Sequence, residues 1–297
     1  MPVALVTSAE YQHLDDDLPL LVGALADLGV EAVLADWHDE AFDWAGMSLA
    51  VLRSTWDYTS QLARFLERLE AIDRATTLAN PLAVVRANAD KAYLLGLAEA
   101  GVPVVPTSLL RPGDDVRLPE GVPFVVKPTV SAGGRDTERY GPGEVDAARA
   151  HAEDLLDAGR PVLVQPYLED IDKAGETGLV FLGDRFSHAF RKGPILRPGT
   201  TFVQGLYREE AITFREPQDH ELELADRVLD AVGAIVDGHD RHDLLYARVD
   251  VAPGLDGPVV MELELIEPSL FLPVAPGSER RAAEAIAARV DQGLAAE

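Results

Sequence analysis

Two glutamates stand two residues apart in an apolar stretch near the C-terminal end of the chain. Glu262 and Glu264 alternate with Met261, Leu263 and Leu265, so an extended strand places both carboxylates on one face. Two like charges on a buried face repel each other and lose hydration, which a fold tolerates only where positive charge compensates them. Carboxylate oxygens are the ligands that Mg²⁺ prefers, usually together with substrate phosphates and water. The pattern therefore predicts a magnesium site on this strand.

A neighbouring strand can complete this site. Asp250 ends the segment YARVD, which the turn-forming segment PGLDGP joins to the glutamate strand. Antiparallel strands joined in this way can bring Asp250 close to Glu262 and Glu264, and Arg248 lies on the same face as Asp250. We expect the three carboxylates to bind metal and Arg248 to stabilise charge on a transferring phosphoryl group. The alternative is three acids facing solvent from a one-sided sheet, which fits the apolar flanking residues less well.

Lysine is rare in this chain, which carries its positive charge mainly on arginine. The four lysines are Lys91, Lys127, Lys173 and Lys192, and Lys127 lies in the apolar segment VPFVVKP. Burial strips a lysine of its hydration, so a lysine at the end of a buried strand indicates an anionic partner such as phosphate. The turn SAGG at 131–134 follows, and its flexible backbone N–H groups suit phosphate oxygens. It matches neither a Walker loop nor a G-x-G-x-x-G pattern, and an ordinary hairpin turn with a solvated lysine is the alternative.

Two weaker signals accompany these lysines. Lys91 begins a predicted helix at 91–101, where the helix N-terminus already attracts anions, although the motif taken alone favours a solvated helix lysine. The apolar strand VLVQPYL turns at Pro166 and can offer backbone groups to a flat heterocycle. An ordinary strand end has the same appearance.

Two other acidic stretches resemble sites without the same support. In ELEL at 221–224, Glu221 and Glu223 fall in helical periodicity, so we expect both on a solvated face. His239 and His242 lie among aspartates in DGHDRHD, but their spacing matches no compact metal motif. We interpret that segment as a solvated loop.

The first 80 residues alternate strands with helices, which predicts a parallel α/β layer. The predicted strands span 3–8, 31–37 and 49–54, and the predicted helices span 18–30 and 61–72. Ligands bind open α/β sheets at the ends of strands, so Arg53, Ser54 and Thr55 are predicted substrate contacts. The proline-containing segment around 78–87 breaks the pattern. We therefore predict an N-terminal α/β substrate domain over 1–86.

The remaining chain mixes strands, hairpins and helices in a different order. We divide it into a lid subdomain over 87–165 and a C-terminal subdomain with the metal site over 166–297. Predicted strands at 102–110, 122–128, 161–168, 244–253 and 258–267 join a hairpin at 175–192 that turns at Gly183 and Asp184. The predicted helices lie at 91–101, 144–159 and 220–236, with a last one near the C-terminus.

Composition narrows the function classes. The chain has 297 residues, 47% of them hydrophobic, no cysteine and a formal net charge of −25. A surface this acidic repels the phosphate backbone of a nucleic acid, and we therefore expect no nucleic-acid partner. A local basic pocket can still bind a small anion. No apolar run reaches the roughly 20 residues of a membrane span, and the start lacks the pattern of a secretion signal. We expect a cytoplasmic protein without a membrane partner, and a homo-oligomer is compatible with the sequence.

The ordered set of motifs resembles the ATP-grasp superfamily over about residues 88–270. The set comprises NADK, VVKP, SAGGRDT, QPYL, GE, YARVD and MELE. Each motif is short, and their order makes the resemblance specific. The resemblance implies an ATP-grasp fold, with an α+β nucleotide-binding part that follows an N-terminal parallel α/β domain.

This resemblance also implies roles for individual residues. Lys91 and Lys127 would contact the nucleotide phosphates, and Glu176 would hold the ribose. The glycine turn over the phosphates would include Ser131, Gly133, Gly134 and Thr137, and the adenine segment Gln165, Pro166, Tyr167 and Leu168. The metal ligands would be Asp250, Glu262 and Glu264. Many members of the family have Glu-x-Asn where this chain has Glu-x-Glu, which retains oxygen donors and adds one negative charge.

Three longer segments, RSTWDY at 53–58, residues 175–192 and ELELIEPSLFL at 262–272, resemble a narrower branch. That branch includes the enzyme that closes O-ureido-D-serine to D-cycloserine. The resemblance implies ATP-dependent carboxylate–amine ligation through an acyl phosphate, with ATP and Mg²⁺, expected as two ions, and a small amino-acid-like substrate. Arg248 and Lys192 would be catalytic, and Glu267 and Ser269 would contact the substrate. A kinase that releases a phosphorylated product and a non-catalytic nucleotide-binding regulatory module are the alternatives.

Overall fold

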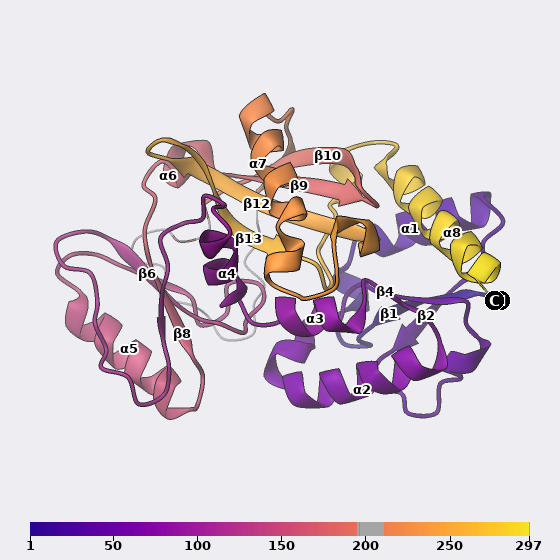
Figure 1. Ribbon diagram of the computed structural model, residues 1–297, viewed down its shortest axis with the longest axis horizontal. Helices are drawn as coiled ribbons and strands as arrows, with labels where there is room; N and C mark the ends of the chain where they lie inside the picture. Colours follow the sequence, from indigo (N-terminus) through magenta and orange to yellow (C-terminus); the bar gives the residue numbers. More distant parts are fainter. Residues whose placement is uncertain (195, 197–210, 297) are drawn as a thin grey trace.

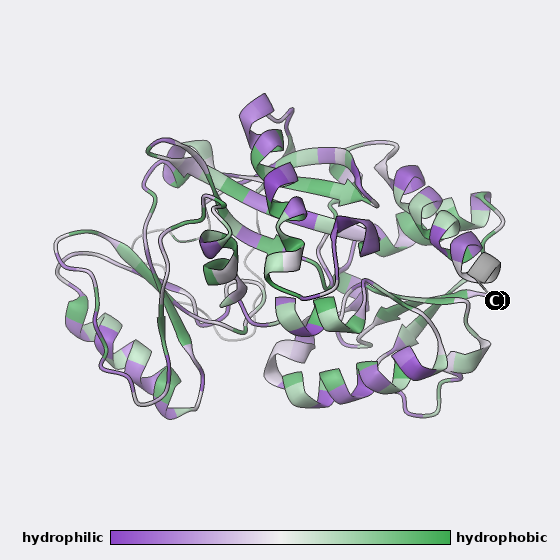
Figure 2. Cartoon of the chain, viewed as in Figure 1, coloured by the Kyte–Doolittle hydropathy of each residue, from purple (hydrophilic) through white to green (hydrophobic). Residues whose placement is uncertain are grey.

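In the computed structural model, the described part of the chain forms three β-sheets, each with its own helices (Figure 1). The structure describes residues 1–194, 196 and 211–296. Apolar residues are frequent in the strands (Figure 2), and buried apolar residues of α2 and α7 belong to two hydrophobic clusters. Among the described residues, no helix combines the length and the apolar composition that crossing a membrane requires.

The first sheet is parallel, as the alternating pattern predicts. Its strand order is β2-β1-β3-β4, with β1 pairing in parallel with both β2 and β3, and β3 with β4. All five residues of β1 are buried, which is typical of a parallel strand covered on both faces. The elements are β1 (Val3–Thr7), α1 (Asp17–Asp27), β2 (Ala32–Asp36), β3 (Leu49–Leu52), α2 (Leu62–Ala75) and β4 (Leu78–Ala79).

The second sheet is antiparallel and contains the predicted phosphate-binding lysine. Its order is β5-β8-β6-β7, and helix α5 packs against β6 and β8. Lys127 lies near the end of β6, just before the glycine turn, which we define as residues 131–137. The elements are β5 (Ser108–Leu110), β6 (Phe124–Pro128), β7 (Glu138–Tyr140), α5 (Val145–Asp157) and β8 (Val162–Pro166).

The third sheet is also antiparallel, with the order β11-β10-β9-β12-β13. The predicted hairpin turn at Gly183 and Asp184 joins β9 to β10, and Leu255 and Asp256 lie in the turn between β12 and β13. The elements are β9 (Glu176–Leu182), β10 (Arg185–Lys192), β11 (Ile212–Phe214), α7 (Asp219–Asp230), β12 (Tyr246–Gly254) and β13 (Gly257–Glu264).

Side chains from an earlier part of the chain cover the outer edge of β13. Asn88, in α3 (Leu82–Asn88), donates to the carbonyl of Leu263 at 2.8 Å and accepts from the amide of Leu265 at 2.9 Å. The hydroxyl of Tyr93, in α4 (Tyr93–Glu99), bonds both backbone groups of Leu263 at 2.9 Å. An uncovered strand edge would expose unpaired backbone groups, so these side chains fix the strand that carries the two glutamates.

Asn80 joins the first sheet to the third. Its side chain is fully buried and donates to the carbonyls of Tyr246 and Leu265 at 2.9 and 2.7 Å, while its oxygen accepts from the amide of Leu245 at 2.7 Å. The backbone of Asn80 has a φ of 56°, a left-handed conformation that asparagine tolerates better than most residues. The segment predicted as a boundary is thus hydrogen-bonded to the third sheet and to residues that adjoin it.

The C-terminal helix α8 (Ser278–Ala296) returns to the start of the chain. It packs against α1, as Figure 1 shows, and against β9 and β10. Leu21 and Leu25 of α1 share a buried cluster with Ala282 and Ile286 of α8. The first sheet is therefore supported by the last helix of the chain as well as by its own helices.

Two predictions about charged residues were wrong. Glu221 does not face solvent: its side chain is buried and accepts hydrogen bonds from the hydroxyl of Thr177 at 2.8 Å and from Arg215 at 2.9 Å. It also accepts from the backbone N–H of Gln218, at the N-terminus of α7, at 2.8 Å. Lys91 does not begin a helix, because α4 starts only at Tyr93.

Candidate active site

A cavity of about 530 Å³ lies between the second and third sheets and the segment that follows β3. This volume is typical of a small-molecule site. Most of the predicted site residues line it, although they come from widely separated segments. Those on the cavity wall are Lys91, Lys127, Ser131, Gly133, Gly134, Thr137, Gln165, Pro166, Tyr167, Leu168, Glu176, Lys192, Arg248, Glu262, Glu264, Glu267 and Ser269.

Four predicted residues do not line the cavity. Arg53, Ser54 and Thr55 are almost completely buried behind it, with exposed fractions of 1%, 0% and 0%. Asp250 is also buried, with 1% of its surface exposed. Residues 53–55 follow the end of β3, as predicted, but they are buried. Trp56, the next residue, lines the cavity in their place.

The register of β12 and β13 pairs the charged residues directly. Arg248 lies opposite Glu264, and Asp250 lies opposite Glu262. A register irregularity follows Asp250, between Asp250 and Val251, on the side away from these pairs. The hairpin therefore places three carboxylates and one guanidinium in one small area.

Arg248 links the acidic residues of this area. Its Nε and Nη2 atoms each donate to Asp250 at 2.9 Å, and Nη2 also contacts Glu264. Nη1 donates to the carbonyl of Ser269 at 3.0 Å. The Nζ atom of Lys192 lies 3.0 Å from Asp250 and 3.8 Å from Glu176. A guanidinium held by several acceptors has a fixed plane, which suits it to bind a planar or charged group in a defined orientation.

The two upstream lysines face the same area. Lys91 donates to the carbonyl of Ser131 in the glycine turn, and its Nζ atom lies 3.3 Å from Oε1 of Glu262. The ammonium group of Lys127 has no hydrogen bond or ion pair with any residue in the described part of the chain, although its backbone pairs within the sheet. Burial lowers the pKa of the Lys127 ammonium, with nearby Lys91 and Lys192 acting in the same direction and Glu262 and Glu176 opposing it. Lys127 is therefore a cation on the cavity wall that an anionic ligand would stabilise.

The carboxyl groups differ in pKa because their cationic neighbours differ. Burial would raise the pKa of Glu262, but Lys91 and Lys127 outweigh it and hold the pKa below its ordinary value. The pKa of Asp250 is lowered in the same way by Arg248 and Lys192 against the effect of burial. Burial dominates at Glu264 and Glu267 and raises their pKa values to about 7 and about 8.

The glycine turn has the backbone freedom that closing over a ligand requires. Gly133 and Gly134 have φ values of 61° and 70°, which residues with a side chain rarely adopt. A Cβ atom at Gly134 would meet open space, so conformation rather than crowding explains this glycine.

The segment Gln165–Leu168 continues β8 into the cavity. The amide of Tyr167 donates to the carbonyl of Pro123 at 2.9 Å, and the side chain of Gln165 donates to Thr107 at 2.8 Å. Val125 and Met261 line the same cavity with apolar surface. A slot between apolar side chains with a fixed backbone edge suits a flat heterocycle.

Sequence reasoning missed part of the cavity wall. Trp56, Tyr58 and Phe271 supply aromatic surface there, and Leu14 and Asp16 approach from the segment before α1. The motif RSTWDY contained a signal for Trp56 and Tyr58, because aromatic residues after a predicted strand end are candidates for ligand contact. Leu14 and Asp16 had no local signal.

Glu262 and Glu264 are the donors that best fit a metal ion. Their carboxylates lie two residues apart on the cavity wall and have the hard oxygen atoms that Mg²⁺ prefers. Both oxygens of Asp250 already accept hydrogen bonds from Arg248 or Lys192. Within residues 1–194, 196 and 211–296, no three acidic or histidine side chains converge as a ready metal cluster. The site thus offers two protein carboxylates and leaves room for ligand oxygens and water, which is a usual arrangement for Mg²⁺.

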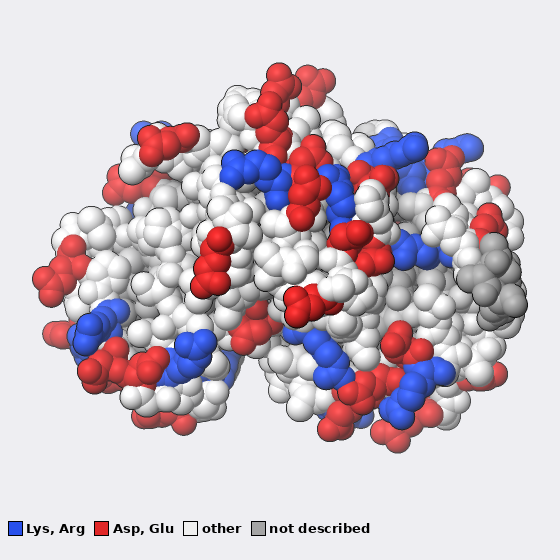
Figure 3. Space-filling view, viewed as in Figure 1, with Lys and Arg blue, Asp and Glu red and all other residues white. Residues whose placement is uncertain are grey.

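The histidine-containing segment at 237–243 makes local contacts. His239 lies 3.0 Å from Asp243, and Asp240 accepts a hydrogen bond from the backbone of His242 at 2.8 Å. None of these residues lines the cavity. On the face drawn in Figure 3, acidic side chains are spread widely rather than gathered into one patch.

Comparison with known proteins agrees with this architecture. Residues 3–80 match the family model described as the N-terminal domain of the D-cycloserine synthetase DcsG. The cycloserine biosynthesis protein DcsG of Streptomyces lavendulae is 38% identical over 301 residues, covering 97% of this chain and 98% of that protein.

Solved structures give the same result. The crystal structure of the D-cycloserine synthetase DcsG superposes with a TM-score of 0.89 at 37% identity, covering 98% of this chain and all of that one. The D-alanine–D-alanine ligase of Bacillus anthracis, complexed with ATP, has a TM-score of 0.68 at 15% identity over 98% of both chains, a likeness of fold alone. This chain is an ATP-dependent ligase with the ATP-grasp fold and belongs to the DcsG family.

Proposed function

We propose that the enzyme closes O-ureido-D-serine to D-cycloserine, using ATP to activate the substrate carboxylate. One observation carries the proposal: Lys91 and Lys127 face Glu262 and Glu264 on the wall of one cavity. A phosphoryl-transfer site needs cationic side chains that bind the phosphates and carboxylates that bind Mg²⁺. The similar DcsG proteins, whose names refer to cycloserine biosynthesis and D-cycloserine synthesis, support the choice of substrate.

Nucleotide binding would use the second sheet. Lys91 and Lys127 would pair with phosphate oxygens, and the glycine turn would close over them with its backbone N–H groups. Gln165–Leu168 would bind adenine, and Glu176 would accept hydrogen bonds from the ribose. The ammonium of Lys127 supports this assignment, because no side chain in the described part of the chain binds it directly and a phosphate oxygen would.

Mg²⁺ would be held by Glu262 and Glu264, and it would neutralise phosphate charge when bound. We propose two ions. Asp250 is a third candidate ligand only if Arg248 as well as Lys192 releases an oxygen of it, because Arg248 donates to both carboxylate oxygens and Lys192 also donates to Oδ2. Ionised glutamates are required, and the cations around Glu262 keep it ionised.

The chemistry would consist of two displacements. Attack of the substrate carboxylate on the γ-phosphorus gives an acyl phosphate and ADP, while Arg248 and Lys192 stabilise the negative charge. Attack of the ureido nitrogen on the acyl carbon then closes the ring and releases phosphate. The ring nitrogen still carries a carbamoyl group, so one water must remove it as carbamic acid, which decomposes to CO₂ and ammonia. Positioning and charge stabilisation supply the rate enhancement.

The small substrate would occupy the aromatic side of the cavity. Trp56, Tyr58 and Phe271 line this part together with Glu267 and Ser269. Glu267 and Ser269 would contact the polar groups of the amino-acid substrate. The buried residues Arg53, Ser54 and Thr55 would support this surface from behind rather than touch the substrate.

We place the reaction in the cytoplasm.

A coupled assay for ADP release tests the proposal. The purified chain with ATP and Mg²⁺ is given O-ureido-D-serine, its L-enantiomer, D-serine and D-alanine in separate reactions, and products are identified by mass spectrometry. We expect ADP release with O-ureido-D-serine that is matched mole for mole by D-cycloserine. Release of ADP with accumulation of a stable phosphorylated product would identify a kinase instead. No substrate-stimulated release would contradict the proposed function.

A further inference from the structure

A short turn at residues 269–272 follows the glutamate strand and borders the cavity. Ser269 and Phe271 line the cavity, and the ring of Phe271 packs edge-on against Phe190 with 4.6 Å between centroids. The backbone of Phe271 has φ 51° and ψ 44°, a left-handed conformation that is uncommon for an aromatic residue. Such a conformation persists only where the surroundings fix it.

One carboxylate binds three successive amides of this turn. Oδ2 of Asp17 accepts from the backbone N–H groups of Leu270 at 2.7 Å and Phe271 at 3.1 Å, and Oδ1 accepts from that of Leu272 at 2.7 Å. Asp17 is the first residue of α1, more than 250 positions earlier in the chain. Hydrogen bonds between an ionised acceptor and backbone amides are stronger than neutral ones, so Asp17 fixes the strained turn.

Arg53 holds this carboxylate from behind. Nη2 of Arg53 lies 3.3 Å from Oδ2 of Asp17, and the two side chains are only 1% and 3% exposed. The amide of Asp17 donates to Asp15 at 3.0 Å, which fixes the start of α1. Nε and Nη1 of Arg53 have no hydrogen-bond partner among the described residues. Among the described residues, Asp17 is therefore the residue to which the guanidinium of Arg53 donates a hydrogen bond.

The same turn is held from the opposite side by residues of the third sheet. The carbonyl of Ser269 accepts from Nη1 of Arg248 at 3.0 Å. The carbonyl of Leu270 lies 2.7 Å from Nε2 of His188 on β10. The turn thus connects Asp17 of the first sheet's layer with the guanidinium in the cavity.

We propose that Asp17 is a positioning residue for catalysis: it fixes the turn 269–272 so that the carbonyl of Ser269 orients Arg248 toward the reacting phosphate. Asp17 does not line the cavity and acts only through this turn. Arg53, which the sequence suggested as a substrate contact, supports Asp17. The inference relies on the catalytic role proposed for Arg248.

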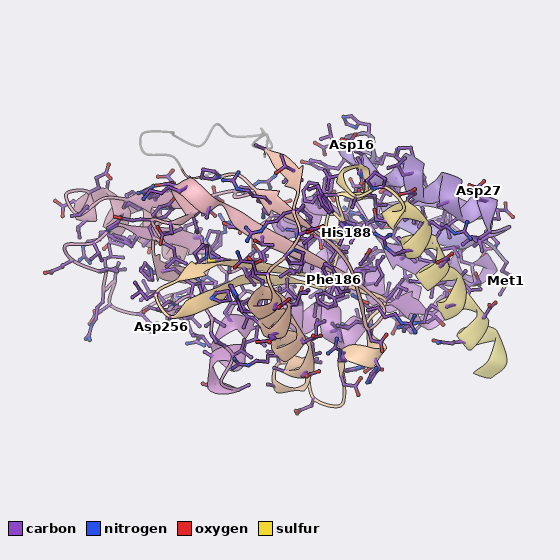
Figure 4. All side chains as sticks on the ribbon, turned by 90° about the horizontal axis from the view of Figure 1, so that it is seen from above. Met1, Asp16, Asp27, Phe186, His188 and Asp256 are labelled. Atoms are coloured by element: carbon purple, nitrogen blue, oxygen red, sulfur yellow. The ribbon has the colours of Figure 1, made fainter. Side chains whose placement is uncertain are left out.

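A double-mutant cycle tests this coupling. The variants are Asp17→Asn, Arg248→Lys and the double variant, with Asp27→Asn as the control. Asp27 is exposed at the far end of α1, so it undergoes the same chemical change without contact with the turn; Figure 4 labels it together with Asp16, the neighbour of Asp17. For each variant, kcat for ADP release and the Kd for ATP are measured separately, and circular dichroism reports folding.

We expect Asp17→Asn to lower kcat by about tenfold or more, because a displaced catalytic group loses much of its effect, while the Kd for ATP changes by less than about twofold. The double variant should be no slower than Arg248→Lys alone, since residues that act through one another are not additive. Asp27→Asn should match the parent protein. An unchanged kcat in Asp17→Asn, or effects that multiply in the double variant, would overturn the inference.

Two provisions keep the result interpretable. If Asp17→Asn does not fold, Arg53→Lys replaces it in the same cycle, with a smaller loss of kcat and the same lack of additivity with Arg248→Lys expected. If the parent protein does not turn over O-ureido-D-serine, the proposed substrate is wrong, and the cycle is read from slow hydrolysis of ATP by water. Arg248 would stabilise that transfer too, so failure of the substrate and failure of the positioning role give different results.

Discussion

Asp250 and Glu262 lie directly opposite each other on β12 and β13, yet different cations hold them. Asp250 is bound by Arg248 and Lys192 at 2.9 to 3.0 Å, whereas Glu262 lies 3.3 Å from Lys91. The cations hold the pKa values of both carboxyl groups below the ordinary range, although burial alone would raise them. The fold thus keeps the buried Asp250 and the half-buried Glu262 ionised side by side.

Glu262→Gln should raise the Mg²⁺ concentration at half-maximal rate by about tenfold or more, because loss of a ligand or of its supporting shell typically costs 10- to 100-fold in metal affinity. The measurement is the rate of ADP release against Mg²⁺ concentration at saturating ATP. Glu223→Gln is the matched control, since Glu223 is exposed on α7 in the similar segment ELEL. An unchanged Mg²⁺ dependence in Glu262→Gln would remove this residue from the metal site.

Lys127→Met should have opposite effects on stability and on nucleotide binding. Burial lowers the pKa of this lysine, so its charge costs free energy in the ligand-free protein, and its removal should leave the unfolding temperature unchanged or higher. The Kd for ATP, measured by calorimetry, should rise by about 10- to 100-fold with the loss of a hydrogen bond to a charged group. Lys173→Met, at an exposed position, should change neither quantity. Tight ATP binding by Lys127→Met would show that Lys127 does not contact phosphate.

Part of the candidate site could be predicted because its charged residues stand out from their neighbours in the sequence. Lys127 and Glu262 occur in short apolar strands where a buried charge is conspicuous, and the parallel first sheet follows from regular alternation of strands and helices. Asp17 gave no such signal, because an acid at a helix start is common and its partners lie at 270–272. Long-range contacts of this kind depend on the packing of distant segments, which no local pattern contains.

The errors have the same origin. Glu221 follows helical periodicity on a polar face, but Thr177 and Arg215 approach it from β9 and from the segment after β11. Arg53 follows a strand end in an open sheet, as ligand contacts often do, but it turns inward to meet Asp17. In both cases the side chain is buried because a residue distant in the sequence binds it.

Gly178→Ala should destabilise the protein, because a Cβ atom at Gly178 would lie 2.3 Å from Cζ of Phe190. Overpacking of this kind typically costs about 1–3 kcal/mol in the free energy of unfolding. Gly23→Ala is the control: Gly23 lies inside α1 with no atom close to the added Cβ, so the variant should be more stable by up to about 1 kcal/mol. Urea unfolding of both variants checks the prediction, and equal effects would contradict the close approach of Phe190.

His188→Gln should reduce the loss of stability in mild acid. Burial lowers the pKa of His188 despite the opposing effect of the Leu270 carbonyl, so the folded protein binds a proton less readily than the unfolded chain. The free energy of unfolding therefore falls as the pH drops below about 6.5, the unfolded value, and levels off only below the lowered pKa. Glutamine keeps a donor for the Leu270 carbonyl without titrating.

The measurement for His188 is the unfolding free energy of the parent and the variant from pH 7.5 to 5. The difference between the two curves should change below pH 6.5 by more than it does for His13→Gln, whose side chain is exposed. Parallel curves for the parent and His188→Gln would contradict a buried, neutral His188.

The acyl-phosphate route is the central claim, and an isotope experiment tests it most directly. O-ureido-D-serine labelled with ¹⁸O in both carboxylate oxygens is turned over by the enzyme with unlabelled ATP and water, and the released phosphate is analysed by mass spectrometry. Transfer of phosphorus to the carboxylate predicts one ¹⁸O atom in each phosphate and one in the ring carbonyl. Unlabelled phosphate, formed while D-cycloserine accumulates, would contradict the account.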